Sequence, residues 1–271
     1  MIGAITRRLS IALALVVILV PYLWLVLTSF KNRVDAFAIP PKVVFQPTLD
    51  SYRALFGTGE YGNYLRNSVI VATATTAISV VLGVPTAYAL TRYQSRWNSL
   101  VLLGMLAVRL LPALVLAVPM YVLFTKFGWT TWFVPVVLAH VTFNLPFVVW
   151  MMRGFFKSIP PSIDEAAMID GLTPFGAFFR TVLPLSLGGL AATTIFCLIN
   201  SWNEFLFALV LTARDTTTLP VSVPGLLSPI GTQWGQIAAV GTVMTIPVML
   251  FAFLAQGYIV QGLTGGAVAG E

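Results

Sequence analysis

Six long stretches of this chain are apolar and nearly free of charge, and they constrain the fold more than any other feature. They cover about residues 9–30, 67–91, 98–124, 132–153, 185–212 and 236–263. Each is long enough to cross the hydrocarbon core of a bilayer as a helix, which takes roughly 20 residues. Because 58% of the 271 residues are hydrophobic and 9% are charged, one soluble core could not bury the apolar surface. We therefore expect an all-α membrane protein in which residues 1–271 form a single domain with six transmembrane helices.

The charged residues do not fix the orientation of these helices. An even number of spans places both termini on one side of the membrane, but Lys and Arg are equally frequent in the loops of the two sides, so the positive-inside rule does not decide. The same scatter leaves no basic patch for nucleic acid, although the isoelectric point is about 9.7. The single cysteine, Cys197, lies in an apolar run and cannot form an intrachain disulfide.

A polar segment at residues 160–184 separates the fourth and fifth apolar runs and has the pattern of a helical hairpin. Its first helix should begin after a Pro-Pro pair, with Ser162 as the N-cap and Glu165 completing a capping box. Ala166 and Ala167 carry almost no side chain, so a partner could approach the backbone of this helix closely. The segment is too polar to be a seventh span.

A turn at Asp170-Gly171 should lead into a second short helix, which Thr173 caps. An apolar stripe then follows one face of this helix and consists of Phe175, Phe178, Phe179 and Val182. Such an element can dock into a groove of another protein. Alternatively, Glu165 only caps its own helix and the phenylalanines rest on the lipid interface. The residues alone leave both interpretations open.

Polar side chains inside the apolar runs are the second set of candidates, because they are expensive in hydrocarbon and usually face protein or water. They are Arg109 in the third run, His140 and Asn144 in the fourth, and Asn200, Asn203 and Glu204 in the fifth. At helical spacing the last three form one polar stripe, and His140 and Asn144 form another. These groups could line a path for a hydroxylated solute, or they could join helices to one another or to a second chain.

The sequence carries no signature of catalysis. It contains no G-x-x-x-x-G-K-[ST] loop to hold ATP, and one cysteine and one histidine cannot make a zinc set with the usual spacing. We expect a non-catalytic chain with no metal and no cofactor of its own.

Several motifs together resemble those of the permease subunits of binding-protein-dependent ABC importers. Glu165-Ala166-Ala167, followed by Gly171 and then by Leu183-Pro184, reproduces the E-A-A signature of these permeases. The resemblance extends through Asn67-Ser68, Trp202-Asn203-Glu204-Phe205 and the glycine-rich segment 262–270. It indicates the carbohydrate-uptake branch, which includes the smaller maltose-transporter permease.

The resemblance implies roles for particular residues. In that family the hairpin is a cytoplasmic coupling helix seated in a cleft of the ATPase, so both termini would be cytoplasmic and the chain would lie in the inner membrane. The ATPase-coupling residues would be Glu165, Ala166, Ala167, Asp170, Gly171 and Phe175. The tail, residues 264–271, would reach toward the ATPase, although family members often carry lysine where this chain has Ala269.

The implied assembly contains a second homologous permease, two copies of an ABC ATPase that bind ATP and Mg, and an extracytoplasmic solute-binding protein. It would import a sugar, polyol or sugar derivative by alternating access. Two other classes stay open on the residues alone. A gradient-driven secondary carrier or channel would usually show internal repeats and more buried acids, and a membrane-anchored scaffold would need neither six spans nor their polar stripes.

Overall fold

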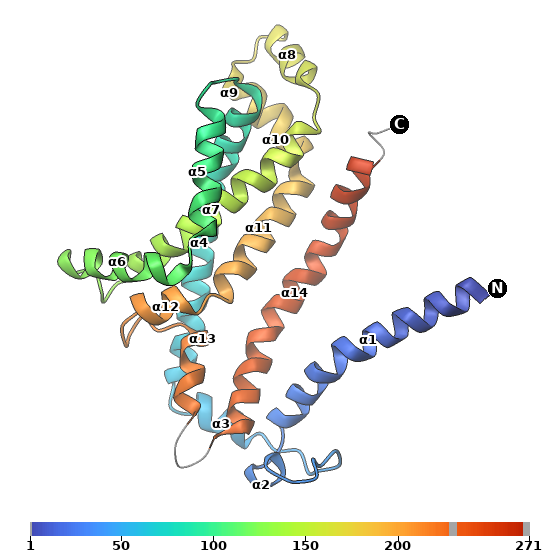
Figure 1. Cartoon of the computed structure of the whole chain (residues 1–271), viewed down its shortest axis with the longest axis vertical. Helices are drawn as coiled ribbons and strands as arrows, with labels where there is room; N and C mark the ends of the chain where they lie inside the picture. Colours follow the sequence, from blue (N-terminus) through green and yellow to red (C-terminus); the bar gives the residue numbers. More distant parts are fainter. Residues whose placement is uncertain (1, 228–231, 268–271) are drawn as a thin grey trace. The chain divides into compact units, whose positions relative to one another are not determined.

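Every regular element in the part of the chain that the structure describes is a helix (Figure 1). The computed structural model describes residues 2–227 and 232–267, with side chains from residue 6 to residue 257, except in the gap and at residue 255. The all-α prediction is confirmed for these residues. The chain divides into two compact units, the first made of residues 1–65 and 219–247 and the second of residues 66–218 and 248–271.

The first unit joins the start of the chain to a segment near its end. Its helices are α1 (Ile2–Ser29), α2 (Arg33–Ala36), α3 (Asp50–Phe56), α13 (Leu219–Ser222), the 3₁₀-helix Val223–Leu226 and the beginning of α14 (Trp234–Ala267). Its core contains Leu55 of α3, Leu219 of α13 and Val240 of α14, each at most 1% exposed. The hydroxyls of Ser29 and Tyr52 lie 2.8 Å apart and tie the end of α1 to α3. Between α1 and α4, residues 30–59 form the short helices α2 and α3 and the turns that join them.

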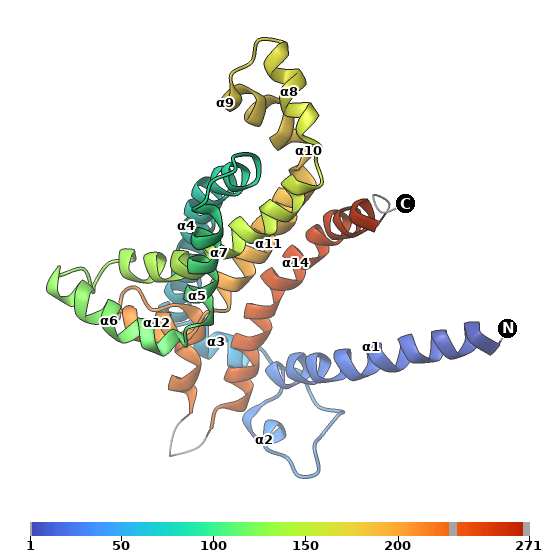
Figure 2. The same cartoon turned by 45° about the horizontal axis from the view of Figure 1, so that its top comes forward.

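The second unit contains most of the apolar helices. They are α4 (Glu60–Arg92, which begins in the first unit), α5 (Asn98–Leu110), α6 (Ala113–Lys126), α7 (Val134–Lys157), α11 (Leu187–Trp202) and α12 (Leu206–Leu211). Helices α7 and α11 lie side by side in both views of the ribbon (Figures 1 and 2). Val148, Met152 and Phe156 form a fully buried row on α7. Helix α7 is therefore the centre of this unit.

The six predicted spans correspond to four unbroken helices and two bent pairs. Thr6–Ser29, Glu60–Arg92, Val134–Lys157 and Trp234–Leu254 are each long and apolar enough to cross a membrane. The predicted third span, 98–124, is instead α5 and α6, bent by 94° between Leu110 and Ala113. The break has a local cause, because Pro112 disfavours helical backbone at the residue before it, and Leu111 is extended with ψ 135°.

The predicted fifth span, 185–212, is also interrupted. The helical segment Pro174–Leu185 meets α11 at a bend of 80°, and α10 (Leu183–Leu185) ends at Ser186, whose hydroxyl donates to the Leu183 carbonyl at 3.0 Å. A second break at residues 203–205 separates α11 from α12. The helices could therefore cross a membrane four times, or up to six times if each bent pair is one span.

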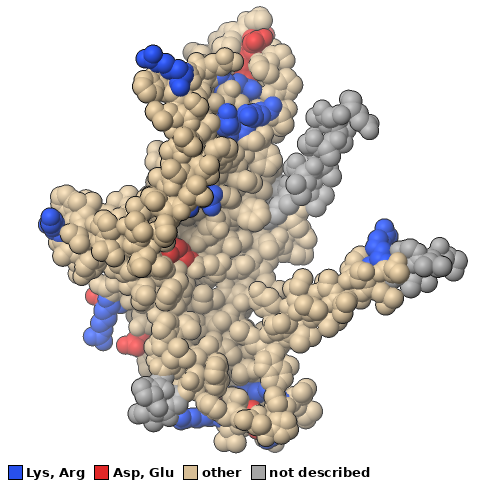
Figure 3. All heavy atoms as spheres, in the orientation of Figure 1, with Lys and Arg blue, Asp and Glu red and all other residues tan. Residues whose placement is uncertain are grey.

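Charged side chains are unevenly distributed over the second unit. On the face shown in Figure 3 they gather at the end that carries α8 (Pro161–Ile169) and α9 (Pro174–Ala177), and they are sparse along the helices. Polar contacts also join the loop after α12 to the first half of α4. The amide of Asn67, which is 2% exposed, donates to the carbonyls of Asp215 and Thr217 at 2.9 Å each. The Asn67-Ser68 motif thus fixes the loop after α12 to α4.

Close packing of α7 and α11 depends on a glycine. A Cβ atom at Gly189 would lie 2.3 Å from the ring of Phe155, so alanine cannot fit without movement of the ring or of a helix. We predict that Gly189→Ala lowers the free energy of unfolding by about 1–3 kcal/mol. The matched control is Gly104→Ala on α5, where no atom lies within 4 Å of the added Cβ. Thermal unfolding of the purified protein in detergent measures both, and equal melting temperatures for the two variants would contradict the prediction.

Candidate functional site

The polar hairpin predicted between the fourth and fifth runs is present and consists of α8 and α9. Gly171 has φ +88°, a left-handed conformation that glycine adopts without strain, and it forms the turn. The hydroxyl of Thr173 accepts a hydrogen bond from the Gly176 amide at 3.1 Å, as an N-cap does. Both local predictions for the turn and for the second helix are confirmed.

The predicted capping box is wrong. Helix α8 begins at Pro161, its N-cap is Pro160, and no side chain caps it, so Ser162 lies inside the first turn. Proline is favoured at the first helical position because its φ is already helical and its missing N–H needs no partner. The second proline of the pair therefore starts the helix instead of stopping the chain before it. Glu165 makes no capping bond and is exposed.

The apolar stripe of the second helix is divided between two environments. Phe178 and Val182 are buried at 3% and 0% exposure, in the π-helical segment Phe178–Val182. Phe175 and Phe179 remain outside at 70% and 44% exposure, with their ring centroids 4.6 Å apart. The inner half of the stripe thus attaches the hairpin to its own unit, and the outer half is free to meet another surface.

The exposed surface of the hairpin combines a carboxylate, a small residue and large apolar side chains. Glu165 and Ala166 are exposed, Ile169 is 86% exposed, and Ala167 is buried at 6%. Asp170, which ends α8, is exposed as well. Ala167 was expected among the ATPase-coupling residues, but its side chain packs inward and cannot contact a partner. We define the coupling surface, named for the role that the resemblance implies, as Glu165, Ala166, Ile169, Asp170 and Phe175.

A buried ion pair holds this hairpin in place, and the sequence analysis missed it. Asp164 is 6% exposed, and its Oδ2 lies 2.8 Å from Nε of Arg92 at the end of α4. The Tyr88 hydroxyl donates to the other carboxylate oxygen of Asp164. Arg92 also donates to the Ile159 carbonyl at 2.9 Å, next to the start of α8. A possible signal was the i, i+4 spacing of Tyr88 and Arg92, which places two polar groups on one face of α4.

Aromatic rings surround the ion pair. The ring of Tyr88 lies 4.6 Å from that of Phe178 and 5.8 Å from that of Phe156, measured between centroids. Phe156 is fully buried. The carboxylate and guanidinium are therefore shielded from water on the inner side, where their attraction is stronger than at a surface. The ends of α4, α7 and α8 are joined to the second hairpin helix in one packed cluster.

The predicted polar stripe of the fifth run is not a helical stripe. Glu204 lies in the break after α11, where its carboxylate accepts hydrogen bonds from the backbone amides of Leu206, Phe207 and Ala208 at 2.9, 2.9 and 3.1 Å. It thereby caps α12. The correction follows from the orphan amides at the start of any helix, which a carboxylate satisfies well in a low-dielectric setting.

His140 joins this cap to the fourth run. Its Nε2 lies 2.9 Å from Glu204 Oε2, and its Nδ1 lies 2.7 Å from the Ser201 hydroxyl. The imidazole is 3% exposed. Of the two interpretations left open for these polar groups, the structure supports the joining of helices for His140 and Glu204.

The other polar candidates are spread over different environments. Asn144 on α7 is buried at 5%. Asn200 and Asn203 are exposed, and the Asn203 amide donates to the Ile199 carbonyl at 3.1 Å. Arg109 is exposed and its guanidinium lies 5.3 Å from the ring centroid of Phe147. Exposed amides and a guanidinium on otherwise apolar helices need water or another protein next to them.

The described chain is all-helical, with several helices apolar enough to span a membrane and one polar hairpin that is partly exposed. Residues 79–265 match the family described as binding-protein-dependent transport system inner membrane component. The chain belongs to this family and is the permease subunit of an ABC importer, located in the inner membrane. The resemblance seen in its motifs is confirmed, and a gradient-driven carrier is not supported.

Relatives align along nearly the whole chain. A probable ABC transporter permease, y4oR of Sinorhizobium fredii, is 38% identical over 252 residues, covering 93% of this chain and 91% of the relative. The trehalose transport system permease SugB of Mycobacterium tuberculosis is 34% identical and covers 93% of each chain. The trehalose/maltose permease MalG of Thermococcus litoralis is 32% identical, covering 94% of this chain and 93% of its own.

The fold also matches that of a solved transporter. A chain of a bacterial ABC transporter that imports the acidic polysaccharide alginate superposes with a TM-score of 0.78, covering 95% of this chain and 96% of its own. The sequence identity is 18%, so this likeness concerns the fold.

The ion pair beneath the hairpin leads to a stability prediction. Asp164→Ala leaves the Arg92 guanidinium, whose side chain is 10% exposed, without its carboxylate, and we expect a loss of about 3–5 kcal/mol. Tyr88→Phe removes one hydrogen bond and should cost about 1 kcal/mol. The control is Asp170→Ala, an exposed carboxylate on the same hairpin, which should change stability by less than about 0.5 kcal/mol. Denaturant unfolding in detergent measures the loss of stability in each variant. A loss in D164A no larger than that in D170A would rule out the ion pair as the anchor of the hairpin.

The cap of α12 by Glu204 leads to a second prediction about stability. Glu204→Ala strips three backbone amides of their acceptor, and we expect a loss of about 2 kcal/mol or more. Glu204→Gln keeps one amide oxygen and should lose less. Asn203→Ala is the neighbouring control, since that side chain donates only to a helix carbonyl in the described structure. The same unfolding measurement applies, and an unchanged stability in E204A would return Glu204 to the set of path-lining candidates.

Proposed function

We propose that this permease moves a sugar, polyol or sugar derivative into the cytoplasm. The support is the set of relatives that align over nearly all of the chain and are named for trehalose, trehalose/maltose, diacetylchitobiose and arabinooligosaccharides. They cover between 92% and 99% of this chain. Because the similarity includes the polar segments and not only the apolar helices, it favours a shared class of solute.

The coupling surface is the element on which this function depends. We propose that α8 and α9 seat in a cleft of the ATPase, with Glu165 as the polar contact and Ile169 and Phe175 as apolar contacts. The observation that supports this most strongly is the contrast within the hairpin. Asp164, Ala167 and Phe178 are buried and attach it to its own unit, whereas the residues of the coupling surface are exposed. Helix-in-groove docking uses apolar anchors at such spacing.

The anchor suggests how motion is transmitted. In a rigid-body mechanism, nucleotide-driven movement of the ATPase would displace the hairpin, and the ion pair between Asp164 and Arg92 would carry this displacement to α4. Packed aromatic rings resist deformation, so the cluster would move as one body. Alternating access would follow from the movement of helices attached to it.

The assembly we propose contains a second homologous permease, two copies of an ABC ATPase that bind ATP and Mg, and an extracytoplasmic solute-binding protein. This chain would be non-catalytic. One solved neighbour is an alginate ABC transporter in complex with a periplasmic protein that holds an alginate pentasaccharide, which supports a binding-protein partner. With the hairpin on the cytoplasmic side and six crossings, both termini would be cytoplasmic.

The path for the solute would lie along the exposed polar groups of the bent helices. Arg109 and Asn200 are exposed on apolar helices, Asn203 is exposed in the break after α11, and a second permease could enclose them in a polar cavity. Asn144 is buried in this chain and would reach the cavity only after a helix movement. The tail, which includes Ala269, lies outside the described residues from 268 onward, and its contact with the ATPase stays a prediction.

ATPase activity of the reconstituted complex tests the coupling surface. In the complete importer with its loaded binding protein, Glu165→Ala should lower binding-protein-stimulated ATP hydrolysis by about tenfold or more, because a charge-assisted contact contributes roughly 1.5–3 kcal/mol. Gln94→Ala, an exposed polar residue in the loop before α5, is the matched control and should leave stimulation unchanged. Assembly of each complex is checked by size-exclusion chromatography.

Two results would count against the proposal. Wild-type stimulation in an assembled E165A complex would show that Glu165 is not part of the coupling contact. A panel of labelled trehalose, maltose, arabinooligosaccharides and diacetylchitobiose tests the solute class separately. Uptake of none of these, with intact stimulation by another solute, would remove the sugar proposal and leave the coupling mechanism standing.

A further inference from the structure

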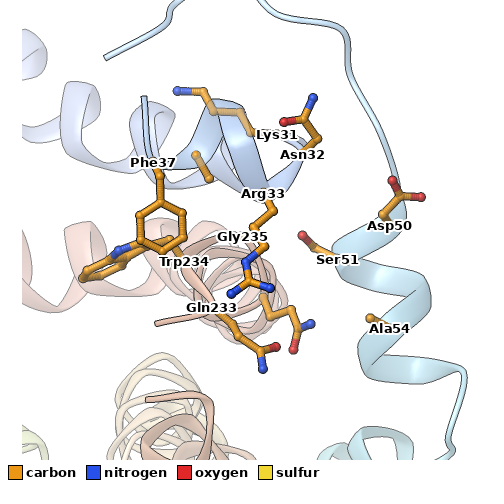
Figure 4. Close-up of a pocket in the computed structure, with 12 residues that line it drawn as sticks. Lys31, Asn32, Arg33, Phe37, Asp50, Ser51, Ala54, Gln233, Trp234 and Gly235 are labelled. Atoms are coloured by element: carbon orange, nitrogen blue, oxygen red, sulfur yellow. The ribbon is translucent and has the colours of Figure 1, made fainter. Parts of the chain in front are cut away.

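A pocket of about 440 Å³ lies in the first unit, whereas the hairpin and its anchor belong to the second (Figure 4). It is an open pocket lined by the segment after α1, by α3 and by the start of α14. Helices α3 and α14 approach closely there, since a Cβ atom at Gly235 would lie 2.5 Å from the Ser51 hydroxyl. The volume falls within the usual range for sites that hold small molecules.

Hydrogen-bond donors converge in this pocket. Figure 4 shows the guanidinium of Arg33 extending toward Gln233, between the ring of Trp234 and the hydroxyl of Ser51. Gln236 also lines the cavity. No hydrogen bond or ion pair joins the Arg33 guanidinium to another group within the described residues. A planar guanidinium with amide and hydroxyl donors around it is a suitable arrangement for a phosphate group.

The local balance of charge is positive. Four basic side chains belong to this region, namely Lys31, Arg33, Lys42 and Arg53. Two carboxylates oppose them: Asp35 lies 2.6 Å from Lys42, and Asp50, which also lines the pocket, lies 3.7 Å from Arg53. The Lys31 ammonium stacks over the Trp24 ring at 3.9 Å and points away from the cavity. An anionic group near Arg33 would therefore meet a net positive field.

The pocket also lies next to the ends of two apolar helices that are long enough to span a membrane. Two basic residues that line it, Lys31 and Arg33, follow shortly after the span Thr6–Ser29. Trp234, which also lines it, is the first residue of another apolar span. Trp234 is 48% exposed and Phe37 is 44% exposed. Amphipathic aromatic rings at span ends are typical of the membrane–water interface. The apolar segment of α1 has no buried residue within the chain, so lipid can surround the helix that leads to the pocket.

We propose that this pocket binds the headgroup of an anionic phospholipid, with its phosphate on Arg33, Gln233 and Gln236 and its glycerol region against Trp234. The acyl chains would then lie along the apolar surface of α1. This proposal concerns a different unit from the coupling surface and does not depend on it. A bound lipid would stabilise the first unit by mass action, because it binds the folded form.

Native mass spectrometry of the purified complete importer tests the proposal. The complex is exchanged into detergent with defined amounts of phosphatidylglycerol, phosphatidylcholine or inorganic phosphate, and the bound species are counted. We expect retention of phosphatidylglycerol by the wild type and about a fivefold loss of retention in Arg33→Gln, as expected for one basic contact to an anionic lipid. Arg96→Gln, an exposed arginine beside Trp97 in the second unit, is the matched control and should retain lipid as the wild type does.

Each other outcome contradicts the proposal. Equal retention by R33Q and the wild type would place the lipid elsewhere, and equal retention of phosphatidylcholine would show that the negative charge is not recognised. Binding of inorganic phosphate at the same affinity would make the site a free-anion site. If R33Q weakened the affinity for the solute-binding protein and left lipid retention unchanged, the pocket would be a protein contact. Since Arg33 is exposed, its substitution should not prevent folding.

Discussion

The ion pair between Asp164 and Arg92 is the interaction on which the functional end of the second unit depends. Without it, the nine-residue helix α8 would be held by the apolar contacts of Ile163 and Ala167 and by the segments before and after it. The attraction acts where both side chains are about nine-tenths buried, with Tyr88 and the Ile159 carbonyl as further partners. Replacing one partner is therefore far more damaging than removing a surface charge. This fixed base leaves the opposite side of the hairpin free to expose a carboxylate and apolar side chains.

The breaks in the apolar helices also depend on polar contacts made within the chain. Where α11 ends, the orphan amides of α12 are taken up by Glu204, and His140 holds that carboxylate in turn. Where α5 ends, Pro112 supplies no amide that would need a partner. A membrane chain can interrupt a helix only if its own groups, or water, replace the lost hydrogen bonds. Glu204 is thus explained by its backbone partners before any role in transport is invoked, whereas Arg109 and Asn200 have no such explanation within the described chain.

The sequence predicted what depends on neighbouring residues and failed where distant residues meet. The turn at Gly171 and the cap at Thr173 were predictable, because backbone conformation and capping are decided within a few positions. The predicted capping box was wrong although it also involves neighbouring residues, because the helix begins at Pro161 and Ser162 therefore lies inside its first turn. The ion pair joins Arg92 to Asp164, 72 residues further along the chain, and His140 meets Glu204, 64 residues further along. No periodicity in the sequence reveals such pairs. Apolar runs likewise indicate the length of a span but not the size of its bends, which are 94° in the run 98–124 and 80° near the start of the run 185–212.

The exposed surfaces of the apolar helices differ in what they can face. Some are purely apolar and can face lipid, and others carry polar groups that must face water or protein. Half of the apolar segment of α7 is buried within the chain, compared with none of that of α1. Between Ser10 and Thr28, α1 carries no charged side chain, so bare lipid satisfies it. The exposed faces of α5 and α11 are different, because Arg109 and Asn200 interrupt them with groups that hydrocarbon cannot solvate. In the proposed assembly, a second permease would cover α5 and α11 and enclose a polar path there, and the apolar helix α1 would lead to the pocket proposed for a headgroup.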